Sequence, residues 1–369
     1  MIHHRPAVVA APVWQIVAVA ARTMTEKTRW ATLALNLSWS RTDVMPKSAR
    51  LRIAATAALL CVTSLAHAQQ WPAKPVRIIA PFAAGGAADT LGRIIAEQLT
   101  TVFRQQFFVE NRGGAGGVVG ALAGAQAEPD GYTLVISSIA SNVLSPAFHA
   151  NVGYDGLRDF THIAYLGGPP TVLIVHPALG ARTYKEFVAI ARASKEPTSY
   201  ISPGTGSNGY LVGEYLARQE GYKVSHIPYK GAGPALTDLI AGHVKLGSIT
   251  FSTATEQIRA GRVLPLAVTT EKRIPNFPDI PTFREEGQDL VTATWFALSG
   301  PARLPNDIVQ ALSRETLKAM QTEAVQKRLA LDAIETRLMS PQEYTRFVES
   351  EIARWAPLAK SLAATVNAQ

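Results

Sequence analysis

The amino-acid sequence predicts an α/β fold of about two domains, with mainly parallel sheets. From Trp71 onward, short apolar or β-branched runs alternate with helical patterns, which is typical of βαβ units. Glycine and proline residues mark the boundaries between these segments. The length of 369 residues corresponds to two domains of roughly 150 residues each, and 47% of the residues are hydrophobic, so each domain can bury a core.

The alternating segments fall into two sets. In the first set, we expect strands at 76–80, 107–110 and 133–137, separated by helices at 89–101 and 117–127. A linking stretch follows. In the second set, we expect strands at 171–175, 199–201, 226–228, 246–250 and 264–268. Helices near 183–193, 208–219 and 234–241, and one that ends at 260, lie between these strands.

The C-terminal region begins with a connector. Residues 271–287 contain three prolines and are expected to form no helix or strand. Residues 294–298 are apolar again, and the tail that follows is helical. A stripe of apolar residues recurs there at helical spacing, at Tyr344, Val348, Ile352, Trp355 and Ala359. We expect this stripe to pack in the core rather than form a partner surface.

Residues 45–68 have the layout of a secretory signal peptide. Basic residues between Lys47 and Arg52 precede an apolar run over 53–65, and small residues at the −3 and −1 positions predict cleavage after Ala68. The alternative is a transmembrane anchor, but the apolar run is shorter than the ~20 residues that span a bilayer. We therefore expect an exported protein.

The residues upstream of this signal, 1–44, are interpreted as an over-extended start, with translation beginning at Met45.

The whole chain has a net charge of +8, which by itself suggests an acidic partner. Residues 1–68 hold eight basic and two acidic residues, so the remaining 301 residues have a net charge of only +2. The single cysteine, Cys61, also lies in the leader. We therefore expect no nucleic-acid partner, no disulfide and no thiol chemistry.

Three glycine-rich loops, each between a predicted strand and a predicted helix, are candidates for an anion-binding site. They span residues 81–93, 110–120 and 202–214 and read PFAAGGAADTLGR, ENRGGAGGVVG and SPGTGSNGYLVGE. Glycine lets a ligand approach the backbone, and the free amides of a helix N-terminus favour an anion. The alternative for any single loop is a purely structural turn. We expect loops from both halves of the chain to face each other across a cleft and hold a carboxylate.

Polar residues near these loops are further candidates. Asp89 begins a helix, where it either caps the helix or contacts a ligand, directly or through water. Ser137, Ser138, Ser141 and Asn142 follow a strand at its C-terminal end, where open α/β sheets bind ligands, although a plain turn is an equal alternative.

Few features indicate catalysis, a cofactor or a metal. Ser207 lacks the glycine two positions earlier that a nucleophile elbow requires. Neither a Walker A lysine nor a dinucleotide fingerprint is present. The histidines of the mature chain are scattered, at His149, His162, His176, His226 and His243, without the spacing of metal ligands. We expect no catalytic residues, no cofactor and no metal site.

An ordered series of motifs resembles the Bug family of periplasmic solute-binding receptors, the substrate-binding components of tripartite tricarboxylate transporters. The likeness covers nearly all of residues 70–360. It is carried by KPV with PFAAGGAAD, ENRGGAGG, SPGTGSNGYLVGE, IPYKGAGPALTDLIAGHV, and LAVTTEKR with PDIPTFREEG. The resemblance implies a two-domain periplasmic-binding-protein (Venus flytrap) fold, with the ligand in the interdomain cleft and a chain that crosses between the domains more than once. Domain 1 would comprise 69–170 and 292–369, and domain 2 would comprise 171–291.

The resemblance also implies a ligand site. In that family, backbone amides and ordered waters from the first and third loops hold a ligand carboxylate. The matching positions in this chain are Phe82, Ala83, Gly85, Gly86, Asp89, Gly204, Gly206, Ser207 and Asn208, with Ser137, Ser141 and Asn142 nearby. The implied partners are a small organic acid or related polar metabolite and the membrane permease subunits of a tripartite tricarboxylate transporter. The implied state is a non-catalytic, periplasmic monomer.

Two positions depart from the family pattern. Tyr210 stands where the family usually has His, and the stretch after Gly242 carries Lys245 and Thr250 where the family usually has acidic residues. Family members that bind amino acids can use an acid there to meet the ammonium group. Its absence favours a plain mono-, di- or tricarboxylate or an aromatic acid.

Two other functions stay open at this point. One is a periplasmic hydrolase or transferase that uses Asp89 or Ser207 in the same cleft. The other is a receptor that passes its ligand signal to a sensor kinase instead of a permease.

Overall fold

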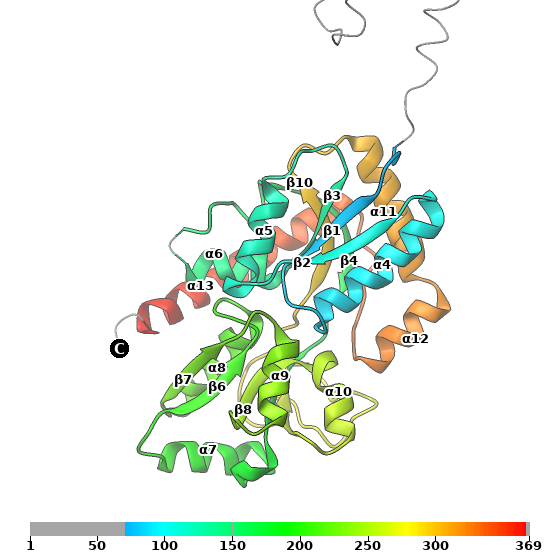
Figure 1. Cartoon of the computed structure of the whole chain (residues 1–369). Coiled ribbons are helices and arrows are strands. Elements are labelled where there is room, and N and C mark those ends of the chain that lie inside the picture. Colours follow the sequence, from blue (N-terminus) through cyan, green and yellow to red (C-terminus); the bar gives the residue numbers. More distant parts are fainter. Residues whose placement is uncertain (1–70, 150, 367–369) are drawn as a thin grey trace, which may run out of the picture. The chain divides into compact units, whose positions relative to one another are not determined.

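The computed structural model describes residues 71–149 and 151–366, which form two α/β domains, each with a five-stranded mixed sheet (Figure 1). The two-domain α/β fold predicted from the sequence is confirmed. The expected signal peptide, 45–68, and the stretch 1–44 lie outside the described residues. Within the described residues, no helix is both long enough and apolar enough to cross a bilayer.

The first domain is built on the sheet β2-β1-β3-β10-β4. Its strands are β1 (Val76–Ala80), β2 (Phe107–Asn111), β3 (Thr133–Ser138), β4 (Phe160–Gly167) and β10 (Phe296–Pro301). β1 pairs in parallel with β2 and β3, whereas β10 is antiparallel to β3 and β4. Three helices share a core with one side of the sheet, namely α4 (Ala87–Phe103), α11 (Asn306–Met320) and α12 (Glu323–Leu331). Helix α5 (Val118–Ala125) packs on the other side.

The second domain repeats this arrangement with the sheet β7-β6-β8-β5-β9. Its strands are β5 (Thr171–Val175), β6 (Thr198–Ser202), β7 (Val224–Pro228), β8 (Leu246–Thr250) and β9 (Leu264–Val268). β6 is parallel to β7 and β8, and β5 is antiparallel to β8 and β9. Helices α7 (Tyr184–Ala193) and α8 (Asn208–Glu220) pack on one side. Helices α9 (Ala232–Ile240) and α10 (Phe251–Arg259) pack on the other.

Two connections join the domains. β4 leads into β5 through residues 168–170, and residues 269–295 lead from β9 to β10. The connections lie side by side, because the amide of Thr294 donates to the carbonyl of Pro169 at 2.9 Å.

The prediction of mainly parallel sheets is only partly correct. Parallel pairing requires a helical crossover within the sheet, whereas β5 and β10 each enter their sheet directly from a connection and run antiparallel to their neighbours.

Strand β4 is the element that the sequence pattern does not predict, since its residues fall in the expected linking stretch. Thr161 and His162 interrupt its apolar run. His162 is nevertheless buried, because β4 pairs with β10 and packs beneath helix α13 (Pro341–Val366). The ring of His162 meets that of Tyr344 of α13 edge-on, with their centroids 4.9 Å apart.

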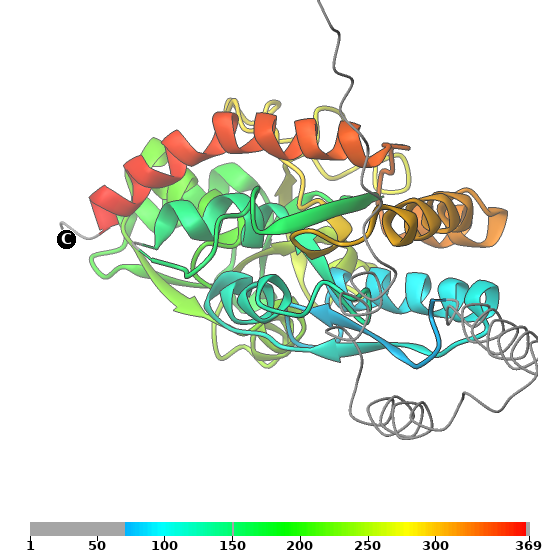
Figure 2. The ribbon, with the colours of Figure 1, turned by 90° about the horizontal axis from the view of Figure 1, so that it is seen from above.

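The remaining predictions for the C-terminal region are confirmed. Residues 271–287 contain no helix or strand. The apolar stripe of α13 packs in the core, where Ile352 is half-buried and the other four residues are buried. Figure 2 shows α13 as a long helix along one side of the two domains. The guanidinium of Arg218 of α8 donates to Ser361 at 3.1 Å, so this helix also touches the second domain.

Candidate functional site

A pocket lies between the domains, where helices of both domains begin. Its lining residues are Phe82, Gly86, Ala87, Ala88, Ala140, Pro203, Ser207, Asn208, Gly209, Ala232, Thr250, Thr294 and Phe296. Four helices start at this lining: α4 from the first domain and α8, α9 and α10 from the second. Among the described residues that line the pocket, none carries a charged side chain.

The backbone supplies the positive electrostatic character of this pocket. The N–H groups of a first helical turn have no acceptor within their own helix, and the helix dipole places partial positive charge at the same end. Ala87 and Ala88 begin α4, and Asn208 and Gly209 begin α8, so amides of both domains reach the pocket. Such an arrangement favours an anion.

The rest of the lining is mostly apolar. Phe82, Phe296 and four alanines provide hydrocarbon surface, while Ser207, Thr250 and Thr294 provide hydroxyl groups. The chemistry of this lining suits a solute with a small anionic end and an apolar body. The cavity itself has a volume of about 30 Å³ in this arrangement of the domains.

Asp89 fixes the shape of the first glycine-rich loop. Its carboxylate, in the first turn of α4, accepts hydrogen bonds from the amide of Gly85 at 3.2 Å and from Asn111 at 3.0 Å. It also pairs with Arg93 at 2.9 Å. Asn111 in turn donates to the carbonyl of Phe82 at 3.1 Å. Burial alone would raise the pKa of Asp89, but the hydrogen bonds outweigh it and hold that pKa below its usual range. The carboxylate is therefore already engaged by the loop.

Ser207 and Asn208 position the third loop in a similar way. Ser207 caps α8, because its hydroxyl accepts from the amide of Tyr210 at 3.1 Å. The side-chain amide of Asn208 donates to Thr171 at 2.8 Å and to Thr294 at 3.2 Å, and its oxygen accepts from Thr292 at 3.1 Å. These bonds occupy the side chain of Asn208 and leave its backbone to face the pocket.

The polar residues at the end of β3, namely Ser137, Ser138, Ser141 and Asn142, do not line the pocket. Ser141 bonds to Ser138 and Asn142, and Asn142 donates to the carbonyl of Gly156 at 2.7 Å. Ser137 is buried near Tyr344 of α13. Only Ala140, from the π-helical turn Ala140–Leu144, reaches the pocket lining.

The structure thus brings together four of the twelve residues expected at the site, namely Phe82, Gly86, Ser207 and Asn208. Gly85 and Asp89 shape the first loop, while Ala83, Gly204 and Gly206 lie where the domains touch. Sequence reasoning missed Thr294 and Phe296 as lining residues, because tertiary topology alone brings them there. It also missed Ala232, which follows Gly231 at the start of α9. Ala87 and Ala88 carry a usable signal, since they follow the first loop at the start of its helix.

The two departures from the family pattern occupy different environments. Tyr210 is buried, with its ring centroid 4.6 Å from that of His226 and 4.9 Å from that of Phe148, so it is a packing residue. Lys245 is exposed. Thr250 lines the pocket, where it presents a hydroxyl instead of a carboxylate.

A serine–histidine pair lies near the third loop but outside the pocket. Ser202 and the Nε2 atom of His226 are 2.7 Å apart, and burial lowers the pKa of His226 to about 4. Ser202 is fully buried and does not line the pocket, so a bound solute would not reach it. Within residues 71–149 and 151–366, no cluster of three His, Cys, Asp or Glu side chains is placed to hold a metal ion.

Two α/β domains with a pocket between them, at which helices of both domains begin, are the architecture of solute-binding proteins. Residues 91–363 match the family described as the tripartite tricarboxylate transporter family receptor, TctC. The chain belongs to this family. The Bug resemblance and the two-domain periplasmic-binding-protein fold are thereby confirmed, and both the family and the fold are those of solute-binding receptors.

Individual relatives agree with this assignment. The chain is 31% identical to protein BugT of Bordetella pertussis over 302 residues, which cover 81% of this chain and 93% of BugT. The structure of R. palustris Rpa4515 with adipate has a TM-score of 0.76 at 32% identity, with 80% of this chain and 99% of that chain covered. The structure of MatC from Rhodopseudomonas palustris with bound malate has a TM-score of 0.75 at 28% identity, with 78% of this chain and 100% of that chain covered.

Proposed function

We propose that this receptor binds a small carboxylate in the pocket between its domains and delivers it to the permease of a tripartite tricarboxylate transporter. One observation carries the proposal: α4 and α8, from different domains, direct their N-termini into one pocket whose lining has no charged side chain. A carboxylate would receive hydrogen bonds from both domains, and its binding would favour their closed arrangement.

The pocket favours a ligand without an ammonium group. Such a group needs a carboxylate or several free acceptors, and the only acidic side chain of the first loop, Asp89, is held by Arg93, Gly85 and Asn111. Phe82 and Phe296 would pack against the apolar part of the ligand. Adipate and malate, the ligands in the two R. palustris structures, have this character, and adipate has the more apolar chain.

The proposal also covers the location of the protein, its processing, its oligomeric state and its domain boundaries. The chain would act in the periplasm as a monomer, after cleavage behind Ala68, and without catalysis. Its first domain would comprise 69–170 and 292–369, and its second domain 171–291. The separate sheets and the paired connections at 168–170 and 292–295 support these boundaries.

A thermal-shift series on the mature chain, residues 69–369, tests this function. Adipate, malate and 6-aminohexanoate would be compared, since the last replaces one carboxylate of adipate by an ammonium group. Adipate at 100 times its dissociation constant should add about 2.7 kcal/mol to the free energy of unfolding. The account predicts stabilisation by at least one dicarboxylate and none by 6-aminohexanoate. Stabilisation by the amino acid alone, or by no carboxylate, would contradict it.

A further inference from the structure

The second glycine-rich loop, residues 110–120, does not line the pocket. It lies instead against the second domain. A Cβ atom on Gly116 would overlap the carbonyl oxygen of Thr205, and one on Gly113 would lie 2.5 Å from the carbonyl oxygen of Lys230. Both acceptors belong to backbone segments of the second domain. Glycine at these two positions therefore lets the backbones of the two domains touch.

Ser145, at the start of the short helix α6 (Ser145–Phe148), lies between the second and third loops. Its hydroxyl donates to the carbonyl of Gly116 at 3.1 Å and lies 3.4 Å from the carbonyl of Gly206. The residue is fully buried. A Cβ atom on Gly206 would lie 2.5 Å from this hydroxyl, so no larger residue fits opposite Ser145.

The first loop is joined to the second domain at the same contact. The amide of Ala83 donates to the carbonyl of Lys230 at 2.8 Å. The loops that begin α4 and α8 are thus both tied to the opposite domain: the first loop through Ala83, and the third loop through Ser145.

We infer that Gly113, Gly116 and Ser145 form a closure seam, which positions the first and third loops over the ligand when the two domains meet. The inference rests on the proposed function, because closure matters only if a solute is held between the domains. These three residues are positioning residues, and none of them lines the pocket. The seam explains why the second loop is rich in glycine although it does not line the pocket.

Gly116→Ala tests the seam, with Gly221→Ala as its matched control. Both glycines have a left-handed backbone, with φ of +62° at Gly116 and +68° at Gly221, so alanine adds similar backbone strain at each. A Cβ atom on Gly221 has no neighbour within 4 Å, whereas on Gly116 it overlaps the carbonyl of Thr205 in the second domain and lies 2.8 Å from the hydroxyl of Ser145 in the first. Ser145→Ala is a second variant, which removes the hydroxyl but fits the space.

The first measurement is the affinity for adipate by isothermal titration calorimetry. Gly116→Ala should weaken binding about tenfold or more relative to Gly221→Ala, because overpacking opposes closure. Ser145→Ala should weaken binding about threefold to tenfold, the range expected for a lost hydrogen bond.

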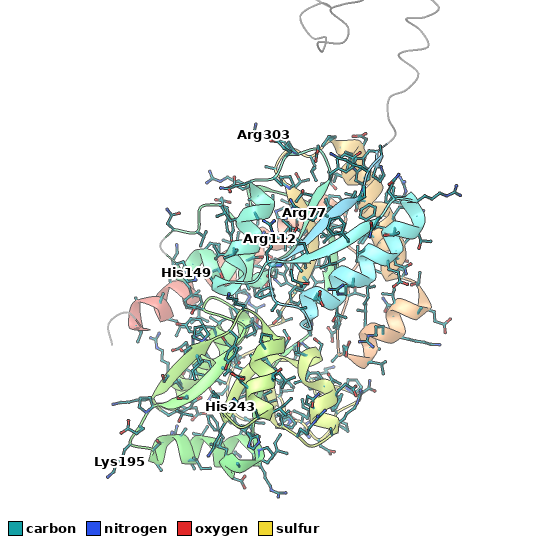
Figure 3. All side chains as sticks on the ribbon, in the orientation of Figure 1. Arg77, Arg112, His149, Lys195, His243 and Arg303 are labelled. Atoms are coloured by element: carbon teal, nitrogen blue, oxygen red, sulfur yellow. The ribbon has the colours of Figure 1, made fainter. Side chains whose placement is uncertain are left out.

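The second measurement is an interdomain distance, which a general loss of stability would not change. Spin labels at Thr101→Cys on α4 and Lys195→Cys at the end of the second domain report the separation by electron spin resonance; Figure 3 shows Lys195 projecting from that end. With and without adipate, Gly116→Ala should shift the distances away from those of Gly221→Ala.

Identical affinities and identical distance distributions for the two glycine variants would overturn the seam. A parent chain that binds no dicarboxylate would instead contradict the proposed function, and the ligand-free distances would still decide the seam.

Discussion

The side-chain amide of Asn208 donates a 2.8 Å hydrogen bond to the hydroxyl of Thr171, the first residue of β5. The same side chain bonds to Thr292 and Thr294 on the other connection between the domains. The helix start that faces the pocket is therefore anchored to the connection 269–295 and to the residue that directly follows the connection 168–170. A solute held at α8 would act directly on the region that joins the domains.

Asn208→Ala should lower the free energy of unfolding by about 2 to 4 kcal/mol, because three buried hydroxyls lose a partner at once. Urea denaturation of the mature chain measures this change. Asn276→Ala is the control, since Asn276 is exposed and donates only one hydrogen bond of 3.4 Å. A change of less than about 0.5 kcal/mol, the usual result for a surface substitution, would refute the anchoring role.

Asp89→Asn should destabilise the protein by about 1 to 3 kcal/mol at pH 7, because it removes the ion pair with Arg93 and one of the two carboxylate oxygens. In the parent, one oxygen accepts from Gly85 and the other from Asn111, and asparagine can accept only one of these hydrogen bonds. The folded-state pKa of Asp89 is lowered, so its contribution is present above the unfolded pKa near 3.9 and is lost as the pH falls through the folded pKa. Denaturation curves from pH 7 to pH 3 should show the variant and the parent converging at the acid end. Asp279→Asn, at an exposed position, is the control and should change the free energy of unfolding at pH 7 by less than about 0.5 kcal/mol.

His162→Phe should make the protein more resistant to mild acid. Burial lowers the pKa of His162 to about 4, so the histidine is neutral in the fold, whereas the unfolded chain takes up a proton below about pH 6.5. Stability is therefore lost as the pH falls from about 6.5 to 4, by about 2 kcal/mol at pH 5. Phenylalanine keeps the edge-on contact with Tyr344 and has no proton to gain.

The measurement for His162→Phe is the free energy of unfolding at pH 7.5 and pH 5. The variant should lose less stability between these values than the parent. An equal loss in the two proteins would show that His162 does not set the acid sensitivity.

Thr250→Asp should convert the pocket from favouring carboxylates to rejecting them. Thr250 lines the pocket and is buried, so an aspartate there would place a negative charge beside the bound anion. We expect the affinity for adipate to fall about 100-fold or more, while Thr250→Asn, which has nearly the same shape without the charge, should lose about tenfold or less. Calorimetry would measure both. Equal losses in the two variants would place the ligand carboxylates elsewhere.

The first and third loops could be predicted from sequence because each combines glycines with a strand-to-helix boundary, and that local pattern places free amides at the end of a strand. Ser207 and Asn208 follow from it directly. Their side chains could not be assigned, because the partners of Asn208 come from residues 37, 84 and 86 positions away in the chain.

Phe296 shows the limit of local patterns. Phe296 begins a strand that enters the first sheet antiparallel after the chain has passed through the second domain. Only the topology brings it to the pocket. The second loop shows the reverse case, since its glycines resemble those of an anion site but face another backbone. A glycine-rich pattern indicates close approach to the backbone and does not say whether a ligand or a protein segment approaches.

A crystal structure of the mature chain with adipate tests the central claim most directly. The account predicts a carboxylate within hydrogen-bond distance of the amides of Ala87 or Ala88 on one side and of Asn208 or Gly209 on the other, with no lysine or arginine in contact. A carboxylate held by a basic side chain, or a ligand bound outside the pocket between the domains, would contradict it.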